Sequence, residues 1–177
     1  MNFVKTIATA DMIRGTRAPA IDVEAPEFTY QIDLGPQQSI PSADAQTATL
    51  LVLYTLPQSR GRLLALATAA SDLARSAIRV VAIPLHSDAA STIEDLRMTE
   101  IAATASPGLA ETYRLLGRNV APANREHLEF LIDRDGRLRA RWDAGGVPPA
   151  AFLVQQVRRF DAEGQRAPRR TAHQRGH

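Results

Sequence analysis

The clearest pattern in the chain is a continuous apolar run followed by a helical repeat of apolar residues. Residues Thr49 to Tyr54 form a run of strand length, which is typical of a central strand covered on both faces. After Pro57, leucine and alanine recur at helical spacing as far as Leu73, and a second β-branched run covers 78–85. Strand, helix and strand in this order predict a βαβ unit with parallel strands.

Two other stretches alternate apolar and polar residues. Glu27 to Leu34 alternates without a break, which predicts a half-buried strand with its apolar side chains on one face. The runs 128–133 and 138–142 flank Asp135-Gly136, and an Asp-Gly turn between alternating runs is a strong signal for an antiparallel hairpin.

The other predicted elements are shorter or lie near the ends of the chain. They are a helix at 8–13, a helix at 90–98, a weak edge strand at 101–103, a helix to Leu116 that Ser106 caps with Pro107 as its first residue, and an amphipathic helix after Pro148-Pro149. Together the elements predict one α/β domain, in which helices flank a central mixed sheet of four to five strands.

The length of 177 residues suits a single domain with irregular ends. We expect a leader or linker at 1–25, the folded domain at 26–162 and a disordered basic tail at 163–177, where arginine, glycine and proline are frequent.

Composition excludes several classes of function. Lys plus Arg number 21 and Asp plus Glu 19, so the formal charge of +2 creates no field that would attract nucleic acid. The sequence contains no apolar run long enough to span a bilayer, so we expect no direct membrane insertion. It also contains no cysteine, which removes disulfides and thiol chemistry and leaves the compartment open.

Three stretches, together with the order of elements, resemble the thioredoxin superfamily. Residues 53–57 resemble the strand end and turn of Sco/SenC and TlpA-type proteins, 105–117 the helix before the hairpin in peroxiredoxin and TlpA relatives, and 130–138 the hairpin itself. The tract 50–66 is also similar to cysteine-less domains associated with CopD-type copper resistance proteins. The resemblance implies a thioredoxin-like fold.

In the members of these families that perform chemistry, two cysteines lie in the turn after the first central strand. The corresponding turn of this chain consists of Pro57, Gln58, Ser59, Arg60 and Gly61. Pro57 and Gly61 stand at the two cysteine positions, and neither is a nucleophile or a metal ligand. The resemblance therefore implies a degenerate active-site turn, with no catalytic residue, no cofactor and no resident metal. The family's cis-proline position falls on His127.

Some residues near this turn have alternative interpretations. His86 and His127 are candidates to bind a ligand, including copper or another metal in place of the lost thiols, although a lone histidine at a strand end is more often a surface residue. Arg60 and Arg62 suit an anion or an acidic partner, or are simply solvated. We interpret Ser59 as a helix N-cap, and Asp133 and Asp135 as turn residues.

We therefore expect a non-catalytic bacterial module that binds or scaffolds another protein. By resemblance it belongs to an envelope or copper-linked system, with a membrane-embedded copper-handling protein as the candidate partner and the periplasm as its compartment. The cytoplasm is the expected compartment if Met1 is the natural start. The alternative is a metal-binding protein that uses histidines.

Overall fold

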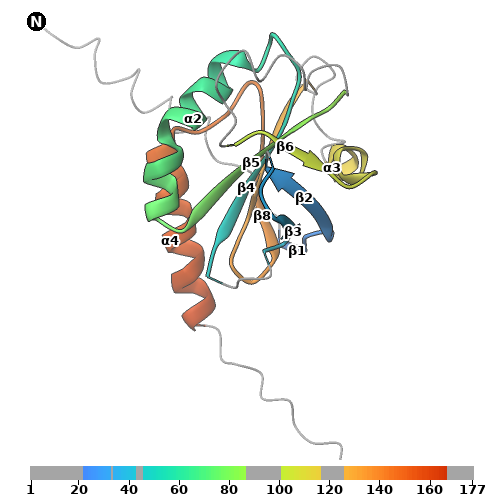
Figure 1. Ribbon diagram of the computed structural model, residues 1–177. Coiled ribbons are helices and arrows are strands. Elements are labelled where there is room, and N and C mark those ends of the chain that lie inside the picture. The colour runs from blue at the N-terminus through green and yellow to red at the C-terminus, as the bar shows by residue number, and fades with distance from the viewer. Residues whose placement is uncertain (1–21, 33, 43–45, 87–100, 117–125, 167–177) are drawn as a thin grey trace, which may run out of the picture.

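The computed structural model describes residues 22–32, 34–42, 46–86, 101–116 and 126–166. Within them the chain forms two sheets and three helices, arranged in layers (Figure 1). A five-stranded mixed sheet has the order β1-β8-β7-β4-β5, and a three-stranded sheet has the order β3-β2-β6. The predicted α/β class with a central mixed sheet is confirmed.

The centre of the large sheet is the predicted βαβ unit. Strand β4 (Ala48–Tyr54) is buried along its whole length and pairs in parallel with β5 (Ile78–Pro84). Helix α2 (Arg60–Arg75) connects them and buries Leu63, Leu66 and Leu73. These three leucines lie at helical spacing, so one stripe of the helix faces the sheet.

The hairpin completes the large sheet. Strand β7 (His127–Ile132) pairs antiparallel with β4 on one side and with β8 (Arg137–Asp143) on the other. The turn contains Gly136 with φ +77°, a conformation that glycine adopts without steric cost. The short strand β1 (Val23–Glu24) pairs with β8 at the edge. The predicted antiparallel hairpin is confirmed.

The second sheet was only partly anticipated. Strand β2 (Phe28–Ile32) is the predicted alternating strand, but Leu34 at its end is 92% exposed. Strand β3 (Gln37–Ile40) pairs with β2 although its sequence is polar, and only Ile40 in it is buried. Strand β6 (Ala103–Ala105) pairs with the other edge of β2, close to the predicted edge strand at 101–103.

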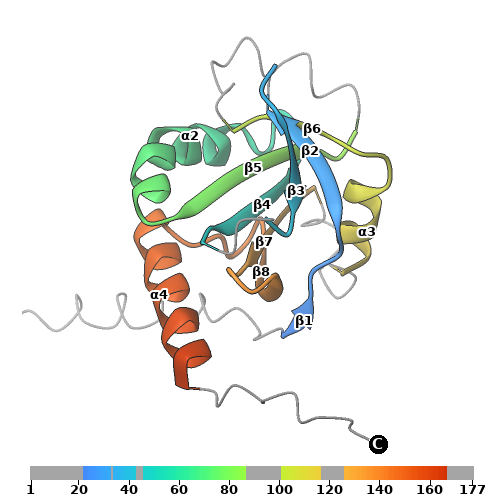
Figure 2. The same cartoon turned by 60° about the horizontal axis from the view of Figure 1, so that its bottom comes forward.

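Two apolar cores lie on opposite faces of the large sheet. Helices α2 and α4 (Ala150–Arg166) cover one face, where α4 contributes Leu153 and Val157. The small sheet and α3 (Leu109–Leu116) cover the other face, where α3 contributes Leu109 and Tyr113 (Figure 2). Strands β4, β5 and β7 supply side chains to both cores, which explains their continuous apolar sequences.

Helix α3 begins later than its sequence predicted. Gly108 has φ +88°, which is outside the right-handed helical region, so the helix starts at Leu109 and not at Pro107. Ser106 thus lies three residues before the first residue of the helix, and its hydroxyl accepts a hydrogen bond from the Thr29 backbone N–H at 3.3 Å. The N-cap interpretation of Ser106 was therefore wrong.

The folded part extends beyond the predicted 26–162. Strand β1 lies before residue 26, and α4 continues to Arg166, past the predicted start of the basic tail. The predicted helices at 8–13 and 90–98, the remainder of the leader and the tail from 167 onward fall outside the described residues. None of the described helices is both long and apolar enough to cross a bilayer.

Candidate functional site

The degenerate turn lies at the carboxyl end of β4, directly before α2. Four of its residues are exposed, namely Pro57, Gln58, Arg60 and Gly61, whereas Ser59 is only 2% exposed. Ser59 occupies the N-cap position of α2, but its hydroxyl makes no capping hydrogen bond. Instead Ser59 Oγ accepts a hydrogen bond from the backbone N–H of Thr55 at 3.3 Å. The side chain thus points inward, so the N-cap interpretation applies to its position but not to its hydroxyl.

The partner of this hydroxyl is His127, the first residue of β7. His127 Nδ1 lies 2.9 Å from Ser59 Oγ, and His127 Nε2 lies 2.9 Å from Glu129 Oε1. His127 is opposite Tyr54 in the β4–β7 ladder, which brings it beside the turn. Residues two apart on a strand share a face, so His127 and Glu129 both face α2. A continuous Ser59–His127–Glu129 chain results.

Arg62 closes this chain from the first turn of α2. Its Nε and Nη2 donate to the two carboxylate oxygens of Glu129 at 2.6 and 2.8 Å, a bidentate pair. Glu129 is fully buried and the side chain of Arg62 is only 15% exposed. This pairing contradicts both predictions for Arg62, namely that its side chain is solvated and that it is free to bind an external anion. We call Ser59, Arg62, His127 and Glu129 the tip network.

The electrostatics of the tip network follow from these contacts. Burial by itself would raise the pKa of the Glu129 carboxyl, but the hydrogen bonds from Arg62 and His127, together with the positive charge of Arg62, lower that pKa below its ordinary value of 4.5. An ionised carboxylate only accepts, so His127 Nε2 carries a proton. In the neutral imidazole, Nδ1 is then the acceptor and the Ser59 hydroxyl donates to it.

The order hydroxyl, imidazole, carboxylate is that of a nucleophile, a general base and an orienting acid. Two features separate the tip network from a working triad. Ser59, His127 and Glu129 are between 0 and 3% exposed, so a substrate has no access to the hydroxyl. Glu129 is also neutralised by Arg62. The arrangement is therefore suited to holding α2 against β7.

The two candidate histidines have different surroundings. His127 is buried with both ring nitrogens engaged, whereas His86 is exposed after the end of β5. Among the described residues, no three metal-ligating side chains gather as a metal site would require. A metal at His127 would have to displace Ser59 or Glu129.

A hollow of about 810 Å³ opens beside the turn, on the α3 side of the large sheet. Thr55 and Glu126 border it where β4 ends and β7 begins, and the Thr55 hydroxyl donates to the Glu126 carbonyl at 2.9 Å. The rest of its wall comes from the end of β5, from β6 and from α3, and it includes His86. It lies at the carboxyl ends of two parallel strands, where open α/β sheets commonly bind ligands.

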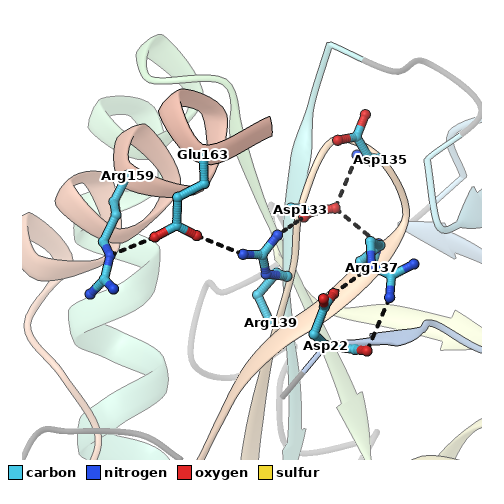
Figure 3. A network of polar contacts seen from close by, with 7 residues as sticks. All are labelled: Asp22, Asp133, Asp135, Arg137, Arg139, Arg159 and Glu163. Atoms are coloured by element: carbon cyan, nitrogen blue, oxygen red, sulfur yellow. Dashed lines mark hydrogen bonds and ion pairs between the residues drawn. The ribbon is translucent and has the colours of Figure 1, made fainter. Parts of the chain in front are cut away.

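The acidic hairpin turn lies away from the tip network. Asp133 Oδ1 accepts the backbone N–H groups of Asp135 and Arg137, which confirms its role as a turn residue. Asp133 Oδ2 also pairs with Arg139, whose guanidinium bridges to Glu163 of α4 (Figure 3). The same guanidinium lies 4.4 Å from the ring centre of Phe160.

Sequence reasoning missed Glu129 altogether and did not pair Ser59 with His127. A signal was present, because Glu129 is a lone charged residue inside the apolar run 128–132. A buried charge requires a partner, but the sequence did not identify Arg62 as that partner. The pairing depends on the β4–β7 register and on the position of α2.

Comparisons with family models and with curated protein sequences found no match. Among solved structures, the chain is similar to a yeast mitochondrial 1-Cys peroxiredoxin (10% identity, TM-score 0.61, 82% of this chain and 78% of that one). It is also similar to a thioredoxin-family thiol:disulfide interchange protein of Chlorobium tepidum TLS (17% identity, TM-score 0.59, 80% of this chain and 98% of that one). A third similar structure is that of BsSco, a member of the Sco family of cytochrome c oxidase assembly proteins (11% identity, TM-score 0.53, 82% of this chain and 97% of that one). The fold is therefore thioredoxin-like, and the chain has no cysteine.

Proposed function

We propose that this chain is a non-catalytic thioredoxin-like module that acts by binding another protein. The observation that carries the proposal is the tip network, in which buried polar groups beside the turn 57–61 take one another as partners. By the resemblance, the two cysteine positions of the family fall on Pro57 and Gly61 of this turn. A chain without cysteine has no thiolate for disulfide exchange or peroxide reduction. The exposed surface of the turn and the hollow beside it are open to an external partner.

The chemistry of the tip network supports a structural role for it. Three side chains that are each nearly inaccessible form one chain of short hydrogen bonds, and the arginine balances the carboxylate charge. Such a network stabilises a unique packing when every member has a partner. Catalysis would need an open hydroxyl and a nearby place for the substrate carbonyl.

The competing hypothesis is ester hydrolysis by Ser59, and a direct assay distinguishes the two. We expect the wild-type chain to hydrolyse p-nitrophenyl acetate no faster than the Ser59→Ala variant, with circular dichroism to verify that both are folded. Turnover that disappears in Ser59→Ala would overturn the proposal. Burst kinetics with acylation of Ser59, detected by mass spectrometry, would do the same.

We further propose that the partner belongs to a copper-linked system of the bacterial envelope, with a membrane-embedded copper-handling protein as the candidate. The support is the resemblance of the tract 50–66 to domains associated with CopD-type proteins. The proposed periplasmic location depends on the same resemblance. Fractionation of cells that express the natural gene tests the location, and exclusive recovery in the cytoplasm would overturn it.

A further inference from the structure

We propose that the hollow between β5 and β6 binds an extended peptide segment of the partner, with an apolar centre and flanking Lys or Arg residues. The inference rests on the proposed binding function and assigns its site and ligand chemistry. Ala102, the residue before β6, forms a parallel bridge with Ala82 of β5, and the Ala82 N–H donates to the Ile101 carbonyl at 2.7 Å. Beyond this bridge the two strands belong to different sheets, and the hollow lies between them.

The β6 side of the hollow offers backbone groups that pair with no described strand. The Ser106 N–H donates to the Thr29 carbonyl at 2.9 Å, and Tyr30 is opposite Ala105 in the β2–β6 ladder. Because hydrogen-bonded and non-hydrogen-bonded pairs alternate in an antiparallel ladder, the N–H and C=O of Ala105 point away from β2. No described strand follows β6 in the small sheet. This edge therefore presents a donor and an acceptor to an added strand.

The β5 side is different. The Leu85 N–H donates to the Tyr54 carbonyl at 2.8 Å, so the backbone of the preceding residue, Pro84, points toward the hollow. Proline has no N–H, so this edge offers an acceptor and no donor. A peptide strand in the hollow would pair with the N–H and C=O of Ala105 and donate one further hydrogen bond to the Pro84 carbonyl. This is strand addition to a sheet edge.

The side chains around the hollow define the rest of the ligand. Ile83, Leu85, Ala105 and Ala110 line it and provide an apolar surface. Its charged residues are Glu111 and Arg114, which pair with each other at 2.7 Å, and Glu126, which is exposed and has no ion pair within the described part of the chain. One carboxylate is thus in excess, which favours a basic group next to an apolar anchor. The volume of 810 Å³ lies in the range of ligand sites, about 300–1,000 Å³.

A labelled peptide library tests this assignment by fluorescence anisotropy with the full chain. The probes are ten-residue peptides with Val, Leu, Ile or Thr in the four central positions and Lys or Arg on both sides. We expect saturable binding, about tenfold weakening when Asp replaces the flanking cations, and loss of binding when the central amides are N-methylated. Nuclear magnetic resonance shifts on binding should be largest around Ala105 and Leu85.

Two variants and one control localise the binding. Ala105→Pro removes the β6 donor without removing a β2 hydrogen bond, and should weaken binding about tenfold. Glu126→Lys should weaken the binding of the basic peptides by a similar factor and leave the fold intact. The test therefore stays valid if Ala105→Pro fails to fold. Glu27→Lys makes the same charge change at an exposed residue outside the hollow and should have no effect.

Three results would overturn the inference, namely no peptide binding, equal binding of the N-methylated peptides, or equal binding by Glu126→Lys and Glu27→Lys. If any of these three results occurs and Ser59 shows no ester hydrolysis, only the peptide site is refuted. Ester turnover by Ser59 would instead refute the proposed non-catalytic function.

Discussion

The tip network and the hairpin ladder both pair arginine with acidic side chains, but in different surroundings. We call the contacts of Asp133, Arg139, Glu163 and Arg159 in Figure 3 the hairpin ladder. In the tip network the Glu129 side chain is 0% exposed and that of Arg62 15%, whereas in the ladder Glu163 is 43% exposed and Arg159 69%. The contact distances are nevertheless alike, 2.6 to 3.1 Å.

The difference in burial shows that distance alone does not measure how much an ion pair contributes to the stability of the fold. An exposed pair is screened by water and salt, and both side chains lose conformational freedom when they pair. A buried charge cannot return to water, so removing its partner leaves a large penalty. We therefore expect the tip network to respond strongly to substitution and the exposed Arg159–Glu163 pair of the ladder weakly, in the order given below.

The largest effect is expected for Arg62→Met. This change leaves the Glu129 carboxylate buried without its bidentate partner, and should lower the free energy of unfolding by about 3–5 kcal/mol. Chemical denaturation monitored by circular dichroism measures it. Arg60→Met is the matched control, because Arg60 is exposed in the same turn of α2, and should stay within about 0.5 kcal/mol. Equal losses in the two variants would refute a structural role of the Arg62–Glu129 pair.

The second effect is a dependence of the free energy of unfolding on pH. The folded-state pKa of Glu129 is lowered, so its contribution is complete above the ordinary value of 4.5 and is lost as pH falls below it toward the folded-state pKa. Glu129→Gln should therefore flatten the fall in unfolding free energy below pH 4.5. The comparison is Asp22→Asn, since Arg137 also lowers the pKa of the exposed Asp22. If Asp22→Asn flattened the profile more than Glu129→Gln, burial would not be the deciding factor.

A smaller effect is expected for Ser59→Ala. The change removes the hydroxyl that His127 Nδ1 contacts and leaves a buried ring nitrogen without its partner, at a cost of about 1–2 kcal/mol. Ser71→Ala, at an exposed position of the same helix, should change stability by less than about 0.5 kcal/mol. Thermal unfolding of both variants checks this, and a neutral Ser59→Ala would mean that the hydroxyl contributes nothing to the network.

The smallest effect is expected in the hairpin ladder. Arg159→Ala removes an exposed pair with Glu163 and should cost less than about 1 kcal/mol. In about 1 M NaCl, where charges are screened within about 3 Å, the difference from wild type should vanish. A cost above about 2 kcal/mol that survives in salt would show that the ladder behaves like a buried network.

The sequence by itself determined the elements whose patterns are strong and local. The apolar run at β4, the leucine spacing of α2 and the Asp-Gly turn each predict their element because side-chain periodicity and turn chemistry act over a few residues. The thioredoxin-like class was implied by the resemblance of three stretches, together with the order of these elements. The absence of cysteine excludes thiol chemistry on composition alone, since no other side chain supplies a thiolate.

Only the tertiary structure decided which distant residues meet. The β4–β7 register places His127 beside the turn, and the packing of α2 on that face brings Arg62 to Glu129, 67 positions along the chain. Strand β3 is polar and pairs because β2 offers it an edge, and Gly108 delays α3 by its backbone conformation. Such contacts depend on register and packing between remote segments, for which a single sequence has no local signal.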